Sequence, residues 1–180
     1  MDLFFRLFDP GIPWSIAVST ILIAFVVTCI VVWQHKESKR KWILMVWIFA
    51  CLILMMYSTV LGRTSHDSYS IRLMPFWSIG AIQDGLIEVL YEKIYNVLFF
   101  VPYGCLLGFR SFSNRVSGFR GFRMSILIGC ATSVFIELMQ LITRTGTCET
   151  DDVICNTVGC GIGALMGGGI CRMIGKLRNK

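Results

Sequence analysis

The sequence predicts an all-α membrane protein, a polytopic helical bundle with about five transmembrane helices. Five long apolar runs alternate with short polar segments, and hydrophobic residues make up 55% of the 180-residue chain. Twelve of the seventeen Lys and Arg residues lie in only three of these segments. A helix of about 20 apolar residues matches the thickness of the bilayer core, so we expect the chain to cross the membrane repeatedly.

The first three runs differ in length. Residues 14–33 and residues 42–61 are each twenty residues long and carry no charge. No small-x-small cleavage site follows residue 33, so we expect the first run to be a permanent span rather than a signal peptide. The third run, residues 94–109, is shorter. We expect it to cross by extending into residues 91–93, by thinning the bilayer, or as a partly re-entrant helix.

The last two runs differ in composition from a simple apolar span. Residues 124–143 form a full-length run that carries Glu137 and Gln140. Residues 153–171 are uncharged, but six of these nineteen residues are glycine. Three glycines are spaced by four residues and form one small-residue ridge: Gly159, Gly163 and Gly167. Such a ridge lets another helix approach closely, either inside the bundle or from a second copy of the chain in a homodimer.

The basic clusters predict the orientation of the chain. They lie within residues 36–41, residues 110–123 and residues 172–180. By the positive-inside rule these segments are cytoplasmic, which places the N-terminus outside and the C-terminus in the cytoplasm. The net charge of +6 therefore reflects topology and contact with membrane lipids, and we expect no nucleic-acid partner.

The length of the chain predicts one membrane domain over residues 1–180. The longest stretch outside the apolar runs is residues 62–93, which is too short for a second domain. A thiol inside an apolar run behaves as a small apolar group, and this is expected for Cys29, Cys51, Cys105, Cys130, Cys160 and Cys171. Cys148 and Cys155 lie outside or at the edge of a run, and the sequence leaves open whether they pair.

Polar residues from several segments are expected to converge at the outer end of the bundle. Glu137, Gln140 and Arg144 are spaced i, i+3 and i+7, so they share one helical face. A carboxylate inside a span is unfavourable, so we expect Glu137 to be either paired with Arg63 or Arg144 or protonated, and we favour the pair. The full set of candidate ligand-binding residues is Arg63, Arg72, Asn96, Glu137, Gln140, Arg144, Asp151, Asp152 and Asn156.

Two adjacent carboxylates precede the glycine-rich run. Asp152 is placed to cap the N-terminus of that helix, and Asn156 follows one turn later. One carboxylate suffices for this cap, and two adjacent carboxylates repel each other. Capping therefore does not explain Asp151. The candidate residues fit either a buried polar network that holds the helices in register or a pocket that opens to the outer surface. We favour the pocket, because so many ionisable groups exceed what packing requires.

These polar segments resemble the VanZ-like family of bacterial membrane proteins. The matching pieces run in order through about residues 45–168, and they are residues 57–63, 72–76, 96–104, 133–140, 144 and 151–159. Cys148 and Glu149 stand where the family pattern leads us to expect a more ordinary polar loop. Family members are associated with lowered susceptibility to glycopeptide antibiotics, teicoplanin above all. The resemblance therefore implies a multi-pass protein of the bacterial plasma membrane with that effect on the cell envelope.

Three functions are compatible with the sequence. The first is non-enzymatic binding of an envelope lipid, a lipid-linked cell-wall intermediate or a glycopeptide antibiotic in the outer pocket. The second is an intramembrane enzyme in which Glu137 is the general acid or base, and Asp151 and Asp152 bind the substrate or a divalent cation. The third, a small transporter, is disfavoured because no internal repeat is visible.

The sequence predicts neither a cofactor nor a resident metal centre. It contains no zinc-binding helix motif, no phosphate-binding glycine loop and no nucleophile elbow. Its two histidines are too few for a histidine-built site. We therefore expect the binding function rather than catalysis.

Overall fold

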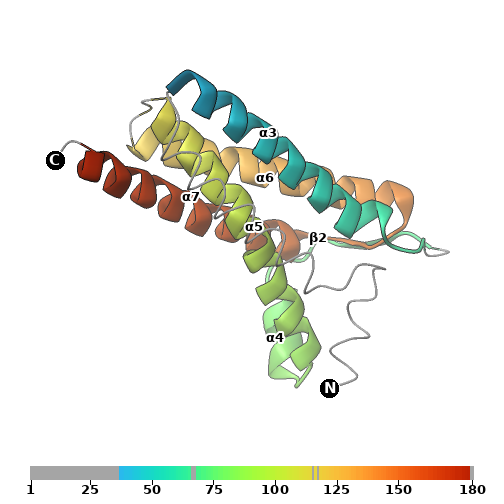
Figure 1. Ribbon diagram of the computed structural model, residues 1–180. Helices are drawn as coiled ribbons and strands as arrows, with labels where there is room; N and C mark the ends of the chain where they lie inside the picture. Colours follow the sequence, from blue (N-terminus) through green and yellow to red (C-terminus); the bar gives the residue numbers. More distant parts are fainter. Residues whose placement is uncertain (1–36, 66–67, 115, 117, 179–180) are drawn as a thin grey trace, which may run out of the picture.

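The computed structural model describes residues 37–65, 68–114, 116 and 118–178, and four long helices dominate it (Figure 1). The predicted first span, residues 14–33, lies outside the described residues. In chain order the elements are α3 (Glu37–Met56), the π-helical turn η1 (Tyr57–Leu61), β1 (Ser70–Arg72), α4 (Trp77–Gln83), α5 (Ile87–Ser113), α6 (Gly118–Thr143), β2 (Thr147–Glu149) and α7 (Thr150–Arg178).

The described chain contains three helical stretches that are long and apolar enough to cross a membrane. They are Lys39–Leu61, Gly118–Thr143 and Thr150–Met173. These stretches contain the second, fourth and fifth apolar runs, which confirms a mainly helical protein with membrane-spanning helices. The third run lies within α5, whose 27 residues extend for about 40 Å. Because α5 is not among the three, the count of five spans stays a prediction, as does the orientation of the termini.

The glycine ridge packs inside the bundle, against α5. The ideal Cβ position of each ridge glycine lies 2.0, 2.0 or 2.2 Å from a carbonyl oxygen of α5, for the pairs Gly159–Val97, Gly163–Val101 and Gly167–Cys105. Both helices advance by four residues from one pair to the next, so α5 and α7 run parallel. No side chain fits between backbones at these distances. The ridge face is therefore covered by α5 and is not available for a homodimer.

The apolar core lies between α3, α5, α6 and α7. One stripe of α3 is buried along its length and consists of Leu44, Ile48, Cys51 and Met55. Phe100 and Tyr103 of α5 are almost fully buried in the same core. The Tyr103 hydroxyl lies 3.1 Å from the Thr132 hydroxyl of α6, so the one polar group of this buried side chain is hydrogen-bonded.

The described chain is mainly helical, as predicted, and adds two short strands that were not predicted from the sequence. β1 and β2 pair in parallel, with Ser70 opposite Thr147, Ile71 opposite Cys148 and Arg72 opposite Glu149. Three residues are too few to show the alternation that reveals a strand, and the partners are far apart in the sequence. The pairing ties the connection before α4 to the segment before α7. It also brings Arg72 and Glu149 together.

Candidate functional site

Charged side chains from α5, α6, α7 and both strands meet at one end of the bundle. We call this group the Lys93 cluster, and its members are Arg72, Lys93, Glu137, Glu149 and Asp152. In Figure 1 the strand β2 and the start of α7 lie beside α5, and there Glu149 and Asp152 pair with Lys93 of α5. The cluster therefore forms where four separate segments of the chain come together.

Lys93 is the centre of the cluster. Its ammonium lies 2.7 Å from a carboxylate oxygen of Glu149 and also pairs with the carboxylate of Asp152. Glu92 approaches the same ammonium to 4.0 Å from a more exposed position. Burial by itself lowers the pKa of Lys93, but the charges and hydrogen bonds of Asp152 and Glu149 outweigh burial and raise the pKa above its ordinary value. Lys93 is therefore a fixed positive charge.

Arg72 occupies the accessible side of the cluster. One of its guanidinium nitrogens lies 2.9 Å from the second carboxylate oxygen of Glu149, so Glu149 bridges Arg72 and Lys93. The Arg72 guanidinium also lies over the Trp77 ring, 3.8 Å from its centroid, which is a close cation–π contact. The Arg72 side chain is 45% exposed. An anionic ligand approaching the cluster would thus meet Arg72 and Trp77 first.

Glu137 is buried but is not paired with an arginine, so the expected pair with Arg63 or Arg144 is wrong. One of its carboxylate oxygens accepts a hydrogen bond from the Glu149 backbone N–H at 3.0 Å. None of the ion pairs among the described residues includes Glu137. Since both cations of the cluster contact Glu149 or Asp152, Glu137 is the carboxyl group left without a cation of its own.

The two arginines that were expected near Glu137 lie elsewhere. Arg144 follows the end of α6 with φ 58°, in the left-handed region, so the helical face shared with Glu137 ends before it. Its guanidinium donates to the Tyr69 hydroxyl at 3.0 Å and lies 4.4 Å from the centroid of that ring. Arg63 is exposed, and its guanidinium lies near Gly146. Both arginines therefore sit on the surface around the cluster.

Asp151 and Asp152 point to different partners, which explains why two adjacent carboxylates occur. Asp151 accepts hydrogen bonds from the Ser78 N–H at 3.0 Å, from the Ser78 hydroxyl and from the Phe76 N–H. It thereby caps α4, a different helix from its own, while Asp152 pairs with Lys93. Phe76 has φ 62°, an unfavourable backbone conformation for a bulky residue, and the hydrogen bond to Asp151 stabilises it. The side chain of Asn96 interacts with Asp152 as well.

Gln140 and Asn156 connect helices rather than lining the charged cluster. The Gln140 amide donates to the Thr59 carbonyl at 3.1 Å, and the Asn156 amide donates to the Ser133 hydroxyl at 2.8 Å. Among the described residues, two buried polar atoms have no hydrogen-bond partner, Asn156 Oδ1 and Trp77 Nε1. Buried polar atoms are usually satisfied, so a water or a ligand is expected at each. The Trp77 ring lies 5.3 Å from the Lys93 ammonium, which places that orphaned donor at the cluster.

The structure thus brings together only part of the predicted set. Arg72, Asn96, Glu137 and Asp152 meet at or beside the Lys93 cluster. Sequence reasoning missed other residues that complete the arrangement, and these are Lys93, Glu149, Trp77, Ser78 and Ser133. Lys93 lies three residues before Asn96 and so shares its helical face, a signal that was present in the sequence. Cys148 and Cys155 are both free thiols.

Comparison with known proteins assigns the chain at the family level. A family model described as VanZ/LLP1 matches residues 41–172, well over half of the chain. This region includes nearly all of the described helices and the whole Lys93 cluster. No curated protein and no solved structure matches the chain.

Proposed function

Because the chain belongs to the VanZ/LLP1 family, we propose that it is a multi-pass protein of the bacterial plasma membrane that lowers susceptibility to glycopeptide antibiotics such as teicoplanin. In this proposal the Lys93 cluster and its surface arginines lie in the outer leaflet. They bind an anionic envelope lipid, a lipid-linked cell-wall intermediate or the antibiotic itself. No catalytic step is needed for such an effect.

The observation that carries the binding proposal is the surface formed by Arg72 and Trp77. A guanidinium has five N–H donors, and the recorded ion pair with Glu149 leaves donors for an incoming phosphate or carboxylate. The Trp77 ring lies 3.8 Å from the Arg72 guanidinium and holds it in place at this surface. The exposed guanidinium of Arg144, stacked on Tyr69, adds a second pair of the same kind.

The paired charges of the cluster support this function in a second way. Lys93 and Asp152 lie at the starts of α5 and α7, and Glu149 lies in the strand between α6 and α7. Their mutual pairing fixes the positions of the surface donors before a ligand arrives. A binding site whose groups are already ordered loses less conformational entropy when it binds.

The proposal is tested by expressing the chain in a teicoplanin-susceptible Gram-positive host and measuring the minimum inhibitory concentration of teicoplanin. A glycopeptide without a lipid tail is measured beside it. We expect the wild-type chain to raise the value for teicoplanin, and Arg72→Gln to remove most of this increase. Arg123→Gln is the matched control, because Arg123 also stacks on an aromatic ring, that of Phe119, but on α6 away from the Lys93 cluster.

Membrane levels of each variant are compared by immunoblot so that a loss of protein is not read as a loss of function. If the wild-type chain leaves teicoplanin susceptibility unchanged, the resistance function is wrong. If Arg72→Gln and Arg123→Gln behave alike at equal protein levels, the site is wrong even though the function stands.

One observation favours a second candidate, an intramembrane enzyme that acts on an envelope lipid. Glu137 is buried and forms no ion pair with any described cation, so its carboxyl group is not committed to a structural charge pair. A carboxyl group in that setting is suited to general acid or base catalysis. Glu137→Gln distinguishes the candidates, because catalysis requires the carboxyl group, whereas the amide keeps the shape and most of the hydrogen bonding needed for binding.

A further inference from the structure

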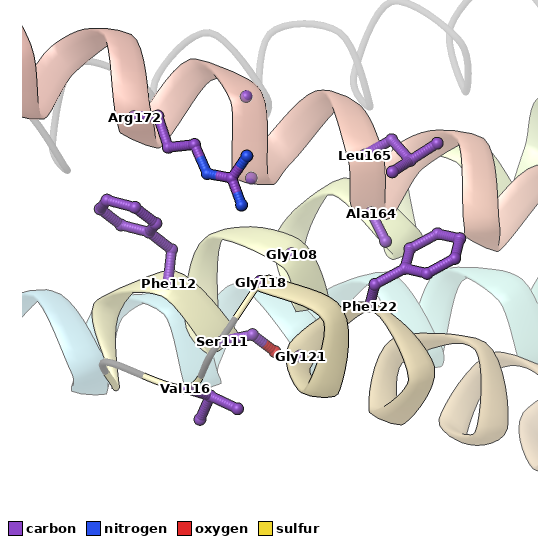
Figure 2. Close-up of a pocket in the computed structure, with 12 residues that line it drawn as sticks. Gly108, Ser111, Phe112, Val116, Gly118, Gly121, Phe122, Ala164, Leu165 and Arg172 are labelled. Carbon is purple, nitrogen blue, oxygen red and sulfur yellow. The ribbon is translucent and has the colours of Figure 1, made fainter.

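A cavity of about 250 Å³ lies near the opposite end of the bundle, between the end of α5, the start of α6 and the second half of α7 (Figure 2). Glycines form much of its wall, and one charged side chain reaches into it. Its lining includes Gly118, Gly168, Ser111, Phe112, Leu165 and Arg172. None of the lining residues is acidic.

Arg172 brings its positive charge to the N-terminus of α6. The ideal Cβ position on Gly118, the first residue of α6, lies 2.2 Å from a guanidinium nitrogen of Arg172. Figure 2 shows this side chain leaving α7 toward Gly118. A helix N-terminus also carries partial positive charge and unpaired N–H groups. Two positive groups therefore face one small space, an arrangement that an anion between them would stabilise.

No protein group in the described part of the chain supplies that anion. The ion pairs recorded there all belong to the Lys93 cluster and its neighbour Glu92. The Ser111 hydroxyl also lines the cavity and is a further hydrogen-bond donor for an anionic group. The cavity thus offers a positive charge and hydrogen-bond donors, and its lining contains no carboxylate.

The rest of the wall is apolar and faces outward from the bundle. Phe112 and Leu165 line the cavity and are themselves 40% and 62% exposed. Leu165 lies in a stretch of α7 that is long and apolar enough to cross a membrane, and Phe112 borders the same cavity from the end of α5, so this wall is expected to contact lipid. The volume is slightly below the roughly 300–1,000 Å³ of pockets that enclose a drug-sized ligand. It suits a phosphate group with the adjoining glycerol and methylenes, while the acyl chains remain in the bilayer.

We propose that this cavity binds the phosphate group of an anionic phospholipid from the leaflet at the basic end of the bundle, with Arg172 as its principal ligand. Basic pockets between membrane helices commonly hold such head groups. The cavity is separate from the Lys93 cluster, since Asp152 and Arg172 are twenty residues apart on one helix, about 30 Å. This inference does not depend on the proposed function.

The test uses the full chain purified in a neutral detergent and delipidated, with its melting temperature followed during lipid addition. Dioleoylphosphatidylglycerol is the anionic probe, dioleoylphosphatidylcholine is the zwitterionic control, and inorganic phosphate tests the free anion. We expect a saturable rise in melting temperature with phosphatidylglycerol and little change with the other two. Arg172→Gln should weaken the apparent affinity by at least about tenfold, the range expected for charge-assisted hydrogen bonds.

Arg120→Gln is the matched control, because it removes the same charge from the same basic end of the bundle, at a residue of the neighbouring basic cluster that does not line the cavity. Gly168→Leu is an independent second variant. Gly168 lines the cavity and a Cβ there meets nothing within 4 Å, so a side chain can start from this position without a backbone clash and take up space at the cavity. We expect this variant to keep its melting temperature without lipid and to lose the response to phosphatidylglycerol.

Four outcomes would overturn the proposal. Phosphatidylcholine could give the same response as phosphatidylglycerol, or phosphate alone could reproduce the whole effect. Arg120→Gln could weaken the affinity as much as Arg172→Gln, which would indicate only general surface electrostatics. If Arg172→Gln does not fold, Gly168→Leu decides, and a normal lipid response in that variant would rule the cavity out.

Discussion

The ammonium of Lys93 lies 2.7 Å from the carboxylate of Glu149, and this pair joins the start of α5 to the strand that leads into α7. Both side chains are almost fully buried, with 7% and 6% of their surfaces exposed. Removing one member of a buried ion pair leaves the other charge without compensation, which is far more unfavourable than losing a surface pair. Assembly of this end of the bundle therefore depends on Lys93.

Lys93→Met is expected to lower the free energy of unfolding by about 3–5 kcal/mol, because Glu149 and Asp152 both lose their buried cation. The measurement is thermal or denaturant unfolding in detergent. Lys39→Met serves as the control, because Lys39 is exposed on α3 and should change stability by less than about 1 kcal/mol. Similar losses in the two variants would show that the buried pair contributes little.

Glu137→Gln is expected to change the free energy of unfolding by less than about 1 kcal/mol, because Glu137 has no cationic partner among the described residues and Gln can accept the same hydrogen bond from Glu149. Combining this change with Arg63→Gln or Arg144→Gln should give additive effects, since additivity is expected where residues do not share an interaction. A coupling energy above about 1 kcal/mol in either double-mutant cycle would indicate that Glu137 does pair with that arginine, contrary to the structure.

Gly163→Leu is expected to disrupt the bundle, whereas Gly168→Leu is expected to be tolerated in lipid-free detergent. A Cβ on Gly163 would lie 2.0 Å from the Val101 carbonyl oxygen, but a Cβ on Gly168 has nothing within 4 Å. Overpacking a tight interface typically costs about 1–3 kcal/mol, and a backbone contact leaves little room to relax. Size-exclusion profiles and melting temperatures of both variants test this, and equal behaviour would argue against close α5–α7 packing.

Asp151→Ala is expected to loosen α4 and the connection before it, because the Asp151 carboxylate accepts hydrogen bonds from the backbone N–H groups of Phe76 and Ser78. Loss of a helix cap usually costs about 0.5–2 kcal/mol. Hydrogen–deuterium exchange should therefore speed up in residues 76–83 and remain unchanged in α5. Asp84→Ala, at the other end of α4, is the control. Unchanged exchange in Asp151→Ala would show that the cap does not stabilise this region.

Single cysteines at Ser38, Ser113 and Asn179, in a chain without its eight native cysteines, are expected to react only with membrane-permeant reagents. The reason is that the positive-inside rule places all three at the cytoplasmic surface. A cysteine at Ser65 or Ser68 should react with an impermeant maleimide added to whole cells. Labelling of any of the first three positions from outside would reverse the proposed orientation.

The candidate site was predicted better in its location than in its pairing. Apolar runs and basic clusters were enough to place Arg72, Glu137 and Asp152 at one end of the bundle, where the structure has them. The partners were not predictable, because the ion pairs Arg72–Glu149 and Lys93–Asp152 join residues 77 and 59 positions apart. The end of α6 also turned Arg144 away from the face it was expected to share with Glu137.

The sequence by itself determined that the second, fourth and fifth apolar runs form helices long and apolar enough to cross a membrane, and it identified the glycine ridge. Both are local, periodic features: a bilayer requires a continuous apolar run, and close helix packing requires small residues four apart. Only the tertiary structure decided that the ridge packs against α5, that Asp151 caps α4 and that Lys93 neutralises Glu149 and Asp152. These relationships depend on which segments meet in space, because a charge or a hydrogen-bond donor selects its partner by distance and not by position along the chain.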